Sequence, residues 1–132
     1  MFKLTKKIEY ALIAISYINK KDKNKLSSSK EISLACNIPR ELLAKIMQSL
    51  TKVGYLNAIK GAKGGYFINQ SLDEIRLIDF IENIEGPFGL VNCQVDQHCD
   101  IINNCEIKTP IFKINENIKT IFKETSLLDI TR

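Results

Sequence analysis

The chain has 132 residues, of which 45% are hydrophobic and 26% are charged. These proportions are typical of one globular domain with a real core, and they leave no room for a separate catalytic domain. The longest apolar run covers residues 10–15 and is too short to cross a bilayer. We therefore expect a single-domain protein of the cytoplasm with no membrane partner.

The net charge of +4 hides a strong asymmetry along the chain. Residues 1–65 hold 13 Lys or Arg against four Asp or Glu, whereas residues 66–132 hold six against 11. A face built to meet a polyanion explains this segregation better than a surface that is merely rich in lysine. The charge pattern therefore favours a nucleic acid as a partner.

Apolar residues at helical spacing predict a first helix over residues 4–20, with a stripe wide enough to contact both its own domain and a partner chain. A lysine-rich turn follows, which is either solvated or in contact with phosphates. Ser28 or Ser29 is expected to cap a short helix that runs through Cys36 and is closed by Asn37.

The next helix is expected to start at Pro39 and to stop at Gly54, because proline suits a first helical turn and glycine a left-handed stop. Two helices joined by about three residues, the second amphipathic, indicate a helix-turn-helix. The predicted buried stripe of the second helix comprises Leu42, Leu43, Ile46, Met47 and Leu50. Its exposed face carries side chains that can reach phosphates or base edges in a major groove, and beside Ala44 these are Arg40, Glu41, Lys45 and Gln48.

A hairpin is predicted next, with strands over residues 55–59 and 66–69 and a glycine-rich turn between them. Lys60 and Lys63 place positive charge in this turn, as suits a wing that contacts DNA phosphates or a minor groove. A phosphate-binding nucleotide loop is excluded by context, because such a loop opens a helix with Gly-Lys-Ser/Thr.

Ser71 and Glu74 match a capping box for a helix that ends at Gly86-Pro87. A polar segment follows, and a last helix is expected from Thr109-Pro110, with isoleucines three and four residues apart that favour a symmetric partner. The fold class is therefore mainly α with a small β wing. We divide it into a winged helix-turn-helix over residues 1–86, a cysteine-bearing loop over 87–107, and a dimerisation helix with its tail over 108–132.

Three cysteines, Cys93, Cys99 and Cys105, stand at equal five-residue gaps in the polar segment. Structural zinc sites usually pair cysteines two to four residues apart, and neither gap closes such a chelate. An iron-sulfur cluster fits better, because its thiolate ligands can be spread along a loop that folds around it. The sequence therefore favours a DNA-binding sensor with these three cysteines as iron ligands.

Other interpretations of the cysteines stay open: a zinc site or thiol switch in a DNA-binding regulator, or inert thiols. A disulfide framework is not expected, because three cysteines cannot pair among themselves and no signal peptide is recognised. Cys36 falls on the apolar side of its helix and is expected in the core. A small iron-sulfur electron carrier is a weaker alternative, and no enzyme activity is expected from a chain with no nucleotide motif and one histidine.

Several motifs together make the chain similar, over nearly its whole length, to the IscR/NsrR family of bacterial transcription regulators. They are Leu4-Thr5 leading to Tyr10-Ala11-Leu12, the wing from Gly61 to Tyr66, Glu85-Gly86-Pro87, the three spaced cysteines, and Thr125-Ser126-Leu127-Leu128-Asp129. The resemblance implies a homodimer that binds a roughly palindromic double-stranded DNA operator. It also implies one iron-sulfur cluster per subunit on Cys93, Cys99 and Cys105, with 4Fe-4S slightly favoured over 2Fe-2S.

The chain departs from the family pattern at the fourth cluster ligand. Lys108 stands where one branch carries a ligating histidine, and Glu9 matches a position from which the partner's first helix supplies a carboxylate in the nitric-oxide-sensing branch. This favours nitric oxide or oxidants as signals, although Glu9 is equally well read as a solvated carboxylate. His98, the only histidine, is a weaker candidate ligand. Ala44 replaces a glutamate with which some relatives discriminate bases, so their operator sequence cannot be transferred.

Overall fold

The computed structural model describes residues 3–91, 94 and 101–131. Cys93, His98 and Cys99 lie outside these residues, so the predictions made for them are not placed by the structure. Within the described ranges the chain is mostly helical with one small antiparallel hairpin, which confirms the predicted fold class. The elements in chain order are α1 Lys6–Lys20, α2 Ser29–Cys36, α3 Arg40–Val53, β1 Leu56–Ile59, β2 Gly65–Ile68, α4 Leu77–Glu85, η1 Ile102–Asn104, α6 Lys108–Glu124 and α7 Leu127–Thr131.

Local sequence signals set the ends of the first three helices. Thr5 caps α1 by accepting the Ile8 N–H, and Ser28 caps α2 by accepting the Glu31 N–H at 3.0 Å. Asn37 ends α2 in the left-handed conformation, with φ 56°. Gly54 ends α3 in the same way, with φ 103°. Helices α2 and α3 are joined by three residues, which confirms the predicted helix-turn-helix.

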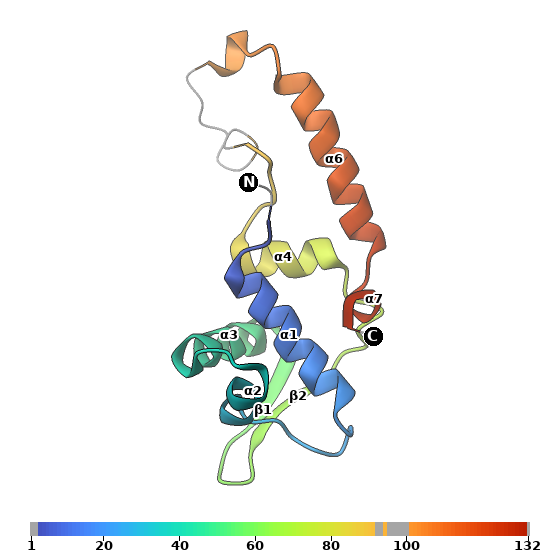
Figure 1. Ribbon diagram of the computed structural model, residues 1–132. Coiled ribbons are helices and arrows are strands. Elements are labelled where there is room, and N and C mark those ends of the chain that lie inside the picture. The colour runs from blue at the N-terminus through green and yellow to red at the C-terminus, as the bar shows by residue number, and fades with distance from the viewer. Residues whose placement is uncertain (1–2, 92–93, 95–100, 132) are drawn as a thin grey trace.

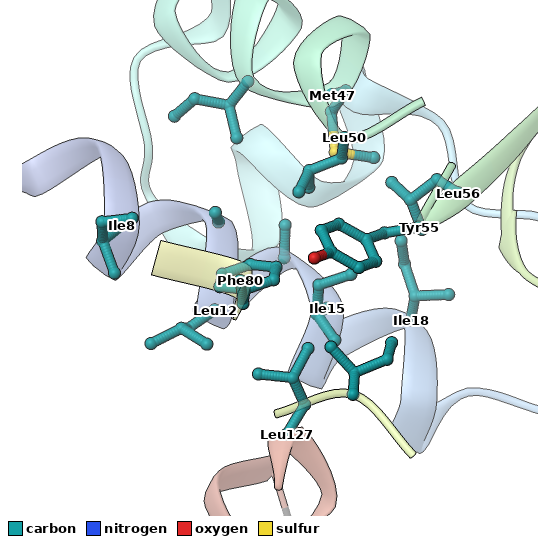
Figure 2. Packing of buried hydrophobic residues seen from close by; sticks show 14 of the residues in the cluster. Ile8, Leu12, Ile15, Ile18, Met47, Leu50, Tyr55, Leu56, Phe80 and Leu127 are labelled. Atoms are coloured by element: carbon teal, nitrogen blue, oxygen red, sulfur yellow. The ribbon is translucent and has the colours of Figure 1, made fainter. Parts of the chain in front are cut away.

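The core is built from helices that lie far apart in the sequence. Ile15 of α1, Leu50 of α3, Phe80 of α4 and Leu127 of α7 are all fully buried. Figure 2 shows Phe80 close to the α1 side chains, with the ring of Tyr55 beside it and Leu127 approaching from the C-terminal helix. The Tyr55 and Phe80 ring centroids are 5.2 Å apart. Residues 127–131 therefore pack into the same core as α1 to α4, and we call α1 to α4 with the β hairpin the winged half.

Helix α4 begins later than the sequence predicts. Ser71 and Glu74 do not form a capping box, and the helix starts at Leu77. Residues 72–74 form a turn, and Arg76 is extended because it lies in an antiparallel bridge with Ser126. In this bridge the Leu77 N–H donates to the Thr125 carbonyl at 2.8 Å, and the Leu127 N–H donates to the Ile75 carbonyl at 3.0 Å. A long-range backbone pairing therefore overrides the local capping signal.

Helix α6 starts at Lys108, one residue before the predicted start, and extends away from the winged half of the molecule (Figure 1). It packs mainly against α4. Among the described residues, no helix is both long and apolar enough to span a membrane.

Candidate functional site

The exposed face of α3 carries the four side chains predicted to meet DNA. Arg40, Glu41, Lys45 and Gln48 are all exposed. Their spacing places them on one side of the helix, while Leu43, Ile46, Met47 and Leu50 bury the other side in the core. Helix α3 thus presents a polar face fixed from behind by apolar packing.

The prediction that Leu42 of α3 is buried is wrong. Leu42 is 37% exposed and does not belong to the buried cluster. It lies at the edge of the stripe, about 100° around the helix from Leu43. Its side chain therefore borders the polar face instead of the core.

The wing is short and its turn is positively charged. Strands β1 and β2 pair from Leu56 with Ile68 to Ile59 with Gly65, and both Lys60 and Lys63 in the turn are exposed. Gly64 is required there, because a Cβ atom at this position would come within 1.9 Å of the Ile59 carbonyl oxygen. The turn thus holds two ammonium groups at the tip of a closed hairpin.

A backbone bridge joins the wing to the helix-turn-helix. Ser27, just before α2, exchanges two hydrogen bonds with Tyr66 of β2, of 2.8 and 3.1 Å. Gly65 permits this approach, because a Cβ atom there would lie 2.9 Å from the Ser27 carbonyl carbon. The bridge therefore fixes the wing relative to the helix-turn-helix. We call the exposed side chains of the two elements together the basic surface (Arg40, Glu41, Lys45, Gln48, Lys60 and Lys63).

Part of the lysine-rich turn after α1 has a structural role. The Lys21 ammonium donates to the Glu31 carboxylate at 2.6 Å and to the Leu26 carbonyl at 2.9 Å. Glu31 also accepts the Tyr17 hydroxyl at 2.8 Å. The Lys21 hydrogen bond holds the pKa of Glu31 below its usual value. The Lys21 ammonium is therefore bonded within the protein, whereas Lys23 and Lys25 are exposed.

The two described cysteines have different environments. Cys36 is half-buried against the core, and burial raises the pKa of its thiol, so it stays protonated at neutral pH. Cys105 is a free, partly accessible thiol in extended backbone directly after η1. In the part of the chain that the structure describes, no three His, Cys, Asp or Glu side chains gather as a metal site. Two of the three predicted cysteine ligands lie outside that part.

Glu9 and Lys108, the residues at issue for the fourth ligand, both have neighbours within the subunit. The Glu9 carboxylate lies 3.0 Å from the Lys6 ammonium and is 41% exposed. The hydrogen bond to Glu9 raises the pKa of Lys6. The Lys108 ammonium lies over the ring of Phe112, 5.9 Å from its centroid. A carboxylate on the surface of α1 remains accessible to a second chain.

Helix α6 carries two neighbouring apolar stripes. One is half-buried against the same chain and includes Ile111, Ile118 and Phe122. The other is exposed at seven-residue intervals, at Ile114 and Ile121 of the helix and at Ile107, which directly precedes it, with exposed fractions of 48%, 60% and 60%. We call these three residues the isoleucine stripe. Such a repeat is the pattern of a helix that pairs with another helix.

Comparisons with known proteins agree with this arrangement. A family model named Rrf2 and described as an iron-dependent transcriptional regulator matches residues 4–132. The structure of CymR, the global cysteine regulator of B. subtilis, is 27% identical with a TM-score of 0.77, and the match covers 99% of this chain and 97% of that one. IscR of T. potens is 20% identical with a TM-score of 0.75, covering 98% and 85% of the two chains. CymR of Staphylococcus aureus is 22% identical with a TM-score of 0.73, covering 97% of each chain. The last two similarities establish the fold alone.

Proposed function

Because the family model covers nearly its whole length, this chain belongs to the Rrf2 family of transcriptional regulators, and we propose that it is a homodimer whose operator binding is controlled by an iron-sulfur cluster. The observation that carries the proposal is the position of Cys93, Cys99 and Cys105 between the winged half and α6. A change at these thiols acts on the segment that joins the DNA-reading elements to the exposed stripe of α6. The protein is expected to act on DNA in the cytoplasm.

The donor chemistry fits an iron-sulfur cluster. Thiolate is the usual ligand of such clusters, and three thiols within 13 residues supply most of a ligand set. Cys105, the described one, is free and partly accessible, whereas Cys36 is half-buried against the core and protonated. When bound, the cluster supplies iron that can react with nitric oxide or oxidants, and the chain's own residues determine how that change reaches the DNA.

A thiol-based or zinc-based regulator is the second candidate. It is supported by the 27% identity to a protein named as the global cysteine regulator of B. subtilis, and by the free, partly exposed thiol of Cys105. The two candidates differ in composition. Anaerobically purified protein should contain iron and acid-labile sulfide in comparable amounts, and zinc without sulfide, or neither metal nor sulfide, would support the second candidate.

Positive charge in the wing should act through phosphates. The double variant Lys60→Ala, Lys63→Ala is expected to weaken binding to every duplex and to flatten the dependence of log K on log salt by about 0.9 for each phosphate that is no longer neutralised. Binding to a random duplex, measured across a salt series, tests this. Lys123→Ala, an exposed lysine on α6, is the matched control. An unchanged salt slope in the double variant would show that the wing lysines do not contact DNA phosphates.

Arg40 and Gln48 should behave differently, because both can make paired hydrogen bonds to base edges. Arg40→Ala and Gln48→Ala are expected to cost about 1–3 kcal/mol on the preferred operator and less on random DNA. The operator is first selected from a random duplex pool. Equal losses on operator and random DNA for both variants would show that neither reads bases.

We propose further that Glu9 of the partner subunit completes the ligand set. Three thiolates leave one iron short of a protein ligand, and Lys108 is not a ligand while its ammonium is protonated. Glu9 is partly exposed on α1 and held only by an ion pair at the surface, an arrangement that costs little to exchange. A carboxylate is a weaker ligand than thiolate for a soft site, so this iron would be the most easily attacked.

Glu9→Ala is therefore expected to allow cluster assembly while changing the visible spectrum and shortening the cluster's lifetime under nitric oxide or air. Anaerobic absorbance spectra and loss kinetics measure both. Lys6→Ala is the matched control, since it breaks the same ion pair but keeps the carboxylate. If Glu9→Ala matches the wild type in spectrum and lifetime, Glu9 is a solvated helix residue and not a ligand.

A further inference from the structure

The segment that leads into the cysteines, Phe88 to Val91, is fastened to two helices. The Phe88 N–H donates to the Glu82 carboxylate of α4 at 3.1 Å. The Phe88 ring meets the ring of Phe122 on α6 edge-on, with centroids 5.6 Å apart. Cys93 follows this segment by two residues, so a displacement of Cys93 would reach these contacts through a short length of chain.

One contact in this group is unusual in its chemistry. The Leu90 N–H donates to the side-chain oxygen of Asn115, in the middle of α6, at 3.1 Å, and also to that of Gln94 at 2.8 Å. Asn115 is only 4% exposed, on a helix whose other inward positions are mostly apolar. A buried amide is costly unless it is hydrogen-bonded, so its presence here indicates a specific role for the bond to Leu90.

Asn115 lies next to the isoleucine stripe on the same helix. It follows Ile114 directly, which places the two side chains about 100° apart around α6. A change in the Leu90 bond therefore acts on the rotation and position of the same turn of α6 that exposes Ile114. Since α4 contacts α1, α3 and α6, the Glu82 bond to Phe88 links the same segment to the winged half.

We infer that Asn115 is the positioning residue that couples the state of the cysteine segment to α6, and through α6 to the spacing of the two DNA-reading surfaces. This inference rests on the proposed function. It requires that the Asn115 bond to Leu90 differ between the cluster-loaded and cluster-free protein. Asn115 itself touches neither the DNA nor the cluster in this account.

The test uses Asn115→Leu in the full-length dimer. Leucine has nearly the shape of asparagine and keeps the helix, and the Leu90 N–H retains its bond to Gln94, so no buried donor is left unpaired. Asn117→Ala, which removes an exposed amide from the same helix, is the matched control. Asn115→Asp keeps an acceptor oxygen at the position and is the conservative variant.

Iron and sulfide content, thermal melting and operator affinity are measured with and without the cluster. Asn115→Leu should load its cluster fully. The factor by which operator affinity differs between the loaded and the cluster-free protein should be at least tenfold smaller in this variant than in the wild type. Asn117→Ala should keep the wild-type ratio, and Asn115→Asp should recover part of it. A wild-type ratio in a fully loaded Asn115→Leu protein would overturn the inference.

Hydrogen exchange on the unaltered protein gives a second readout that does not depend on the variant folding. The Leu90 amide should exchange at least tenfold faster in one cluster state than in the other, because without the Asn115 bond it is held only by Gln94, which lies between Cys93 and Cys99 and belongs to the cysteine segment itself. Equal protection in both states would also overturn the coupling role. If the wild type holds no iron and sulfide, or binds its operator equally in both states, the proposed function fails first and this inference falls with it.

Discussion

Replacing Cys93, Cys99 or Cys105 singly with alanine is expected to abolish the visible absorbance of anaerobically isolated protein, because each removes a thiolate that an iron-sulfur cluster needs. Iron and sulfide content should fall with the absorbance. The measurement is a set of anaerobic spectra with metal analysis on the same samples.

Cys36→Ala is the control for this series. Its thiol packs against the core and is kept protonated by burial, so its loss should leave the spectrum unchanged. Full visible absorbance in a Cys99→Ala protein would contradict the three-cysteine ligand set. Loss of absorbance in Cys36→Ala without loss of thermal stability would show that a fourth cysteine had been overlooked.

The double variant Ile114→Glu, Ile121→Glu is expected to convert the dimer to a monomer. Both side chains are large, apolar and exposed in the single chain. In the proposed homodimer four of them meet across a symmetric interface, and burying the exposed half of each contributes about 0.8–1.5 kcal/mol, so about 3–6 kcal/mol of association energy is lost. Since 1.4 kcal/mol corresponds to a tenfold change in Kd, micromolar samples should be monomeric and operator binding should be lost with the dimer.

Light scattering coupled to size exclusion measures this directly. Thr109→Glu with Thr120→Glu adds the same charges at exposed positions of α6 away from the isoleucine stripe, and this control should remain dimeric. A dimeric double isoleucine variant that still binds its operator would place the subunit interface elsewhere.

The winged half was largely predictable from sequence because its signals are local. Ser28 starts α2 with a side-chain cap, and Asn37 and Gly54 end α2 and α3 with left-handed turns. Each of these signals acts within a few residues. The exposed positions of Arg40 and Lys63 likewise follow from helical and hairpin spacing alone. The basic surface could therefore be named before its geometry was known.

What was missed depends on residues distant in sequence. The late start of α4 follows from the bridge between Arg76 and Ser126, 50 positions along the chain. The short helix α7, which buries Leu127 completely, was expected only as a tail. A helix of five residues is too short to show the apolar periodicity by which helices are recognised in a sequence, so α7 could not be predicted from its own residues.

Asn115 was missed for a related reason. A polar residue within the apolar repeat of α6 is normally predicted to be exposed. The hydrogen bond that Asn115 accepts comes from Leu90, which lies 25 residues earlier in the sequence and packs back against α6. The available signal was its position between Ile111 and Ile118, on the side of the helix that carries those isoleucines. The partner at Leu90 was not predictable from that signal.

Control of DNA binding by the cluster is tested most directly by comparing operator affinity in one preparation before and after the cluster is removed. An operator selected from a random duplex pool is titrated anaerobically with the loaded protein, and then with the same protein after nitric oxide treatment or chelation. If the cluster controls operator binding, the two affinities differ at least tenfold while light scattering shows a dimer throughout. Equal affinities for the loaded and cluster-free dimer would contradict it.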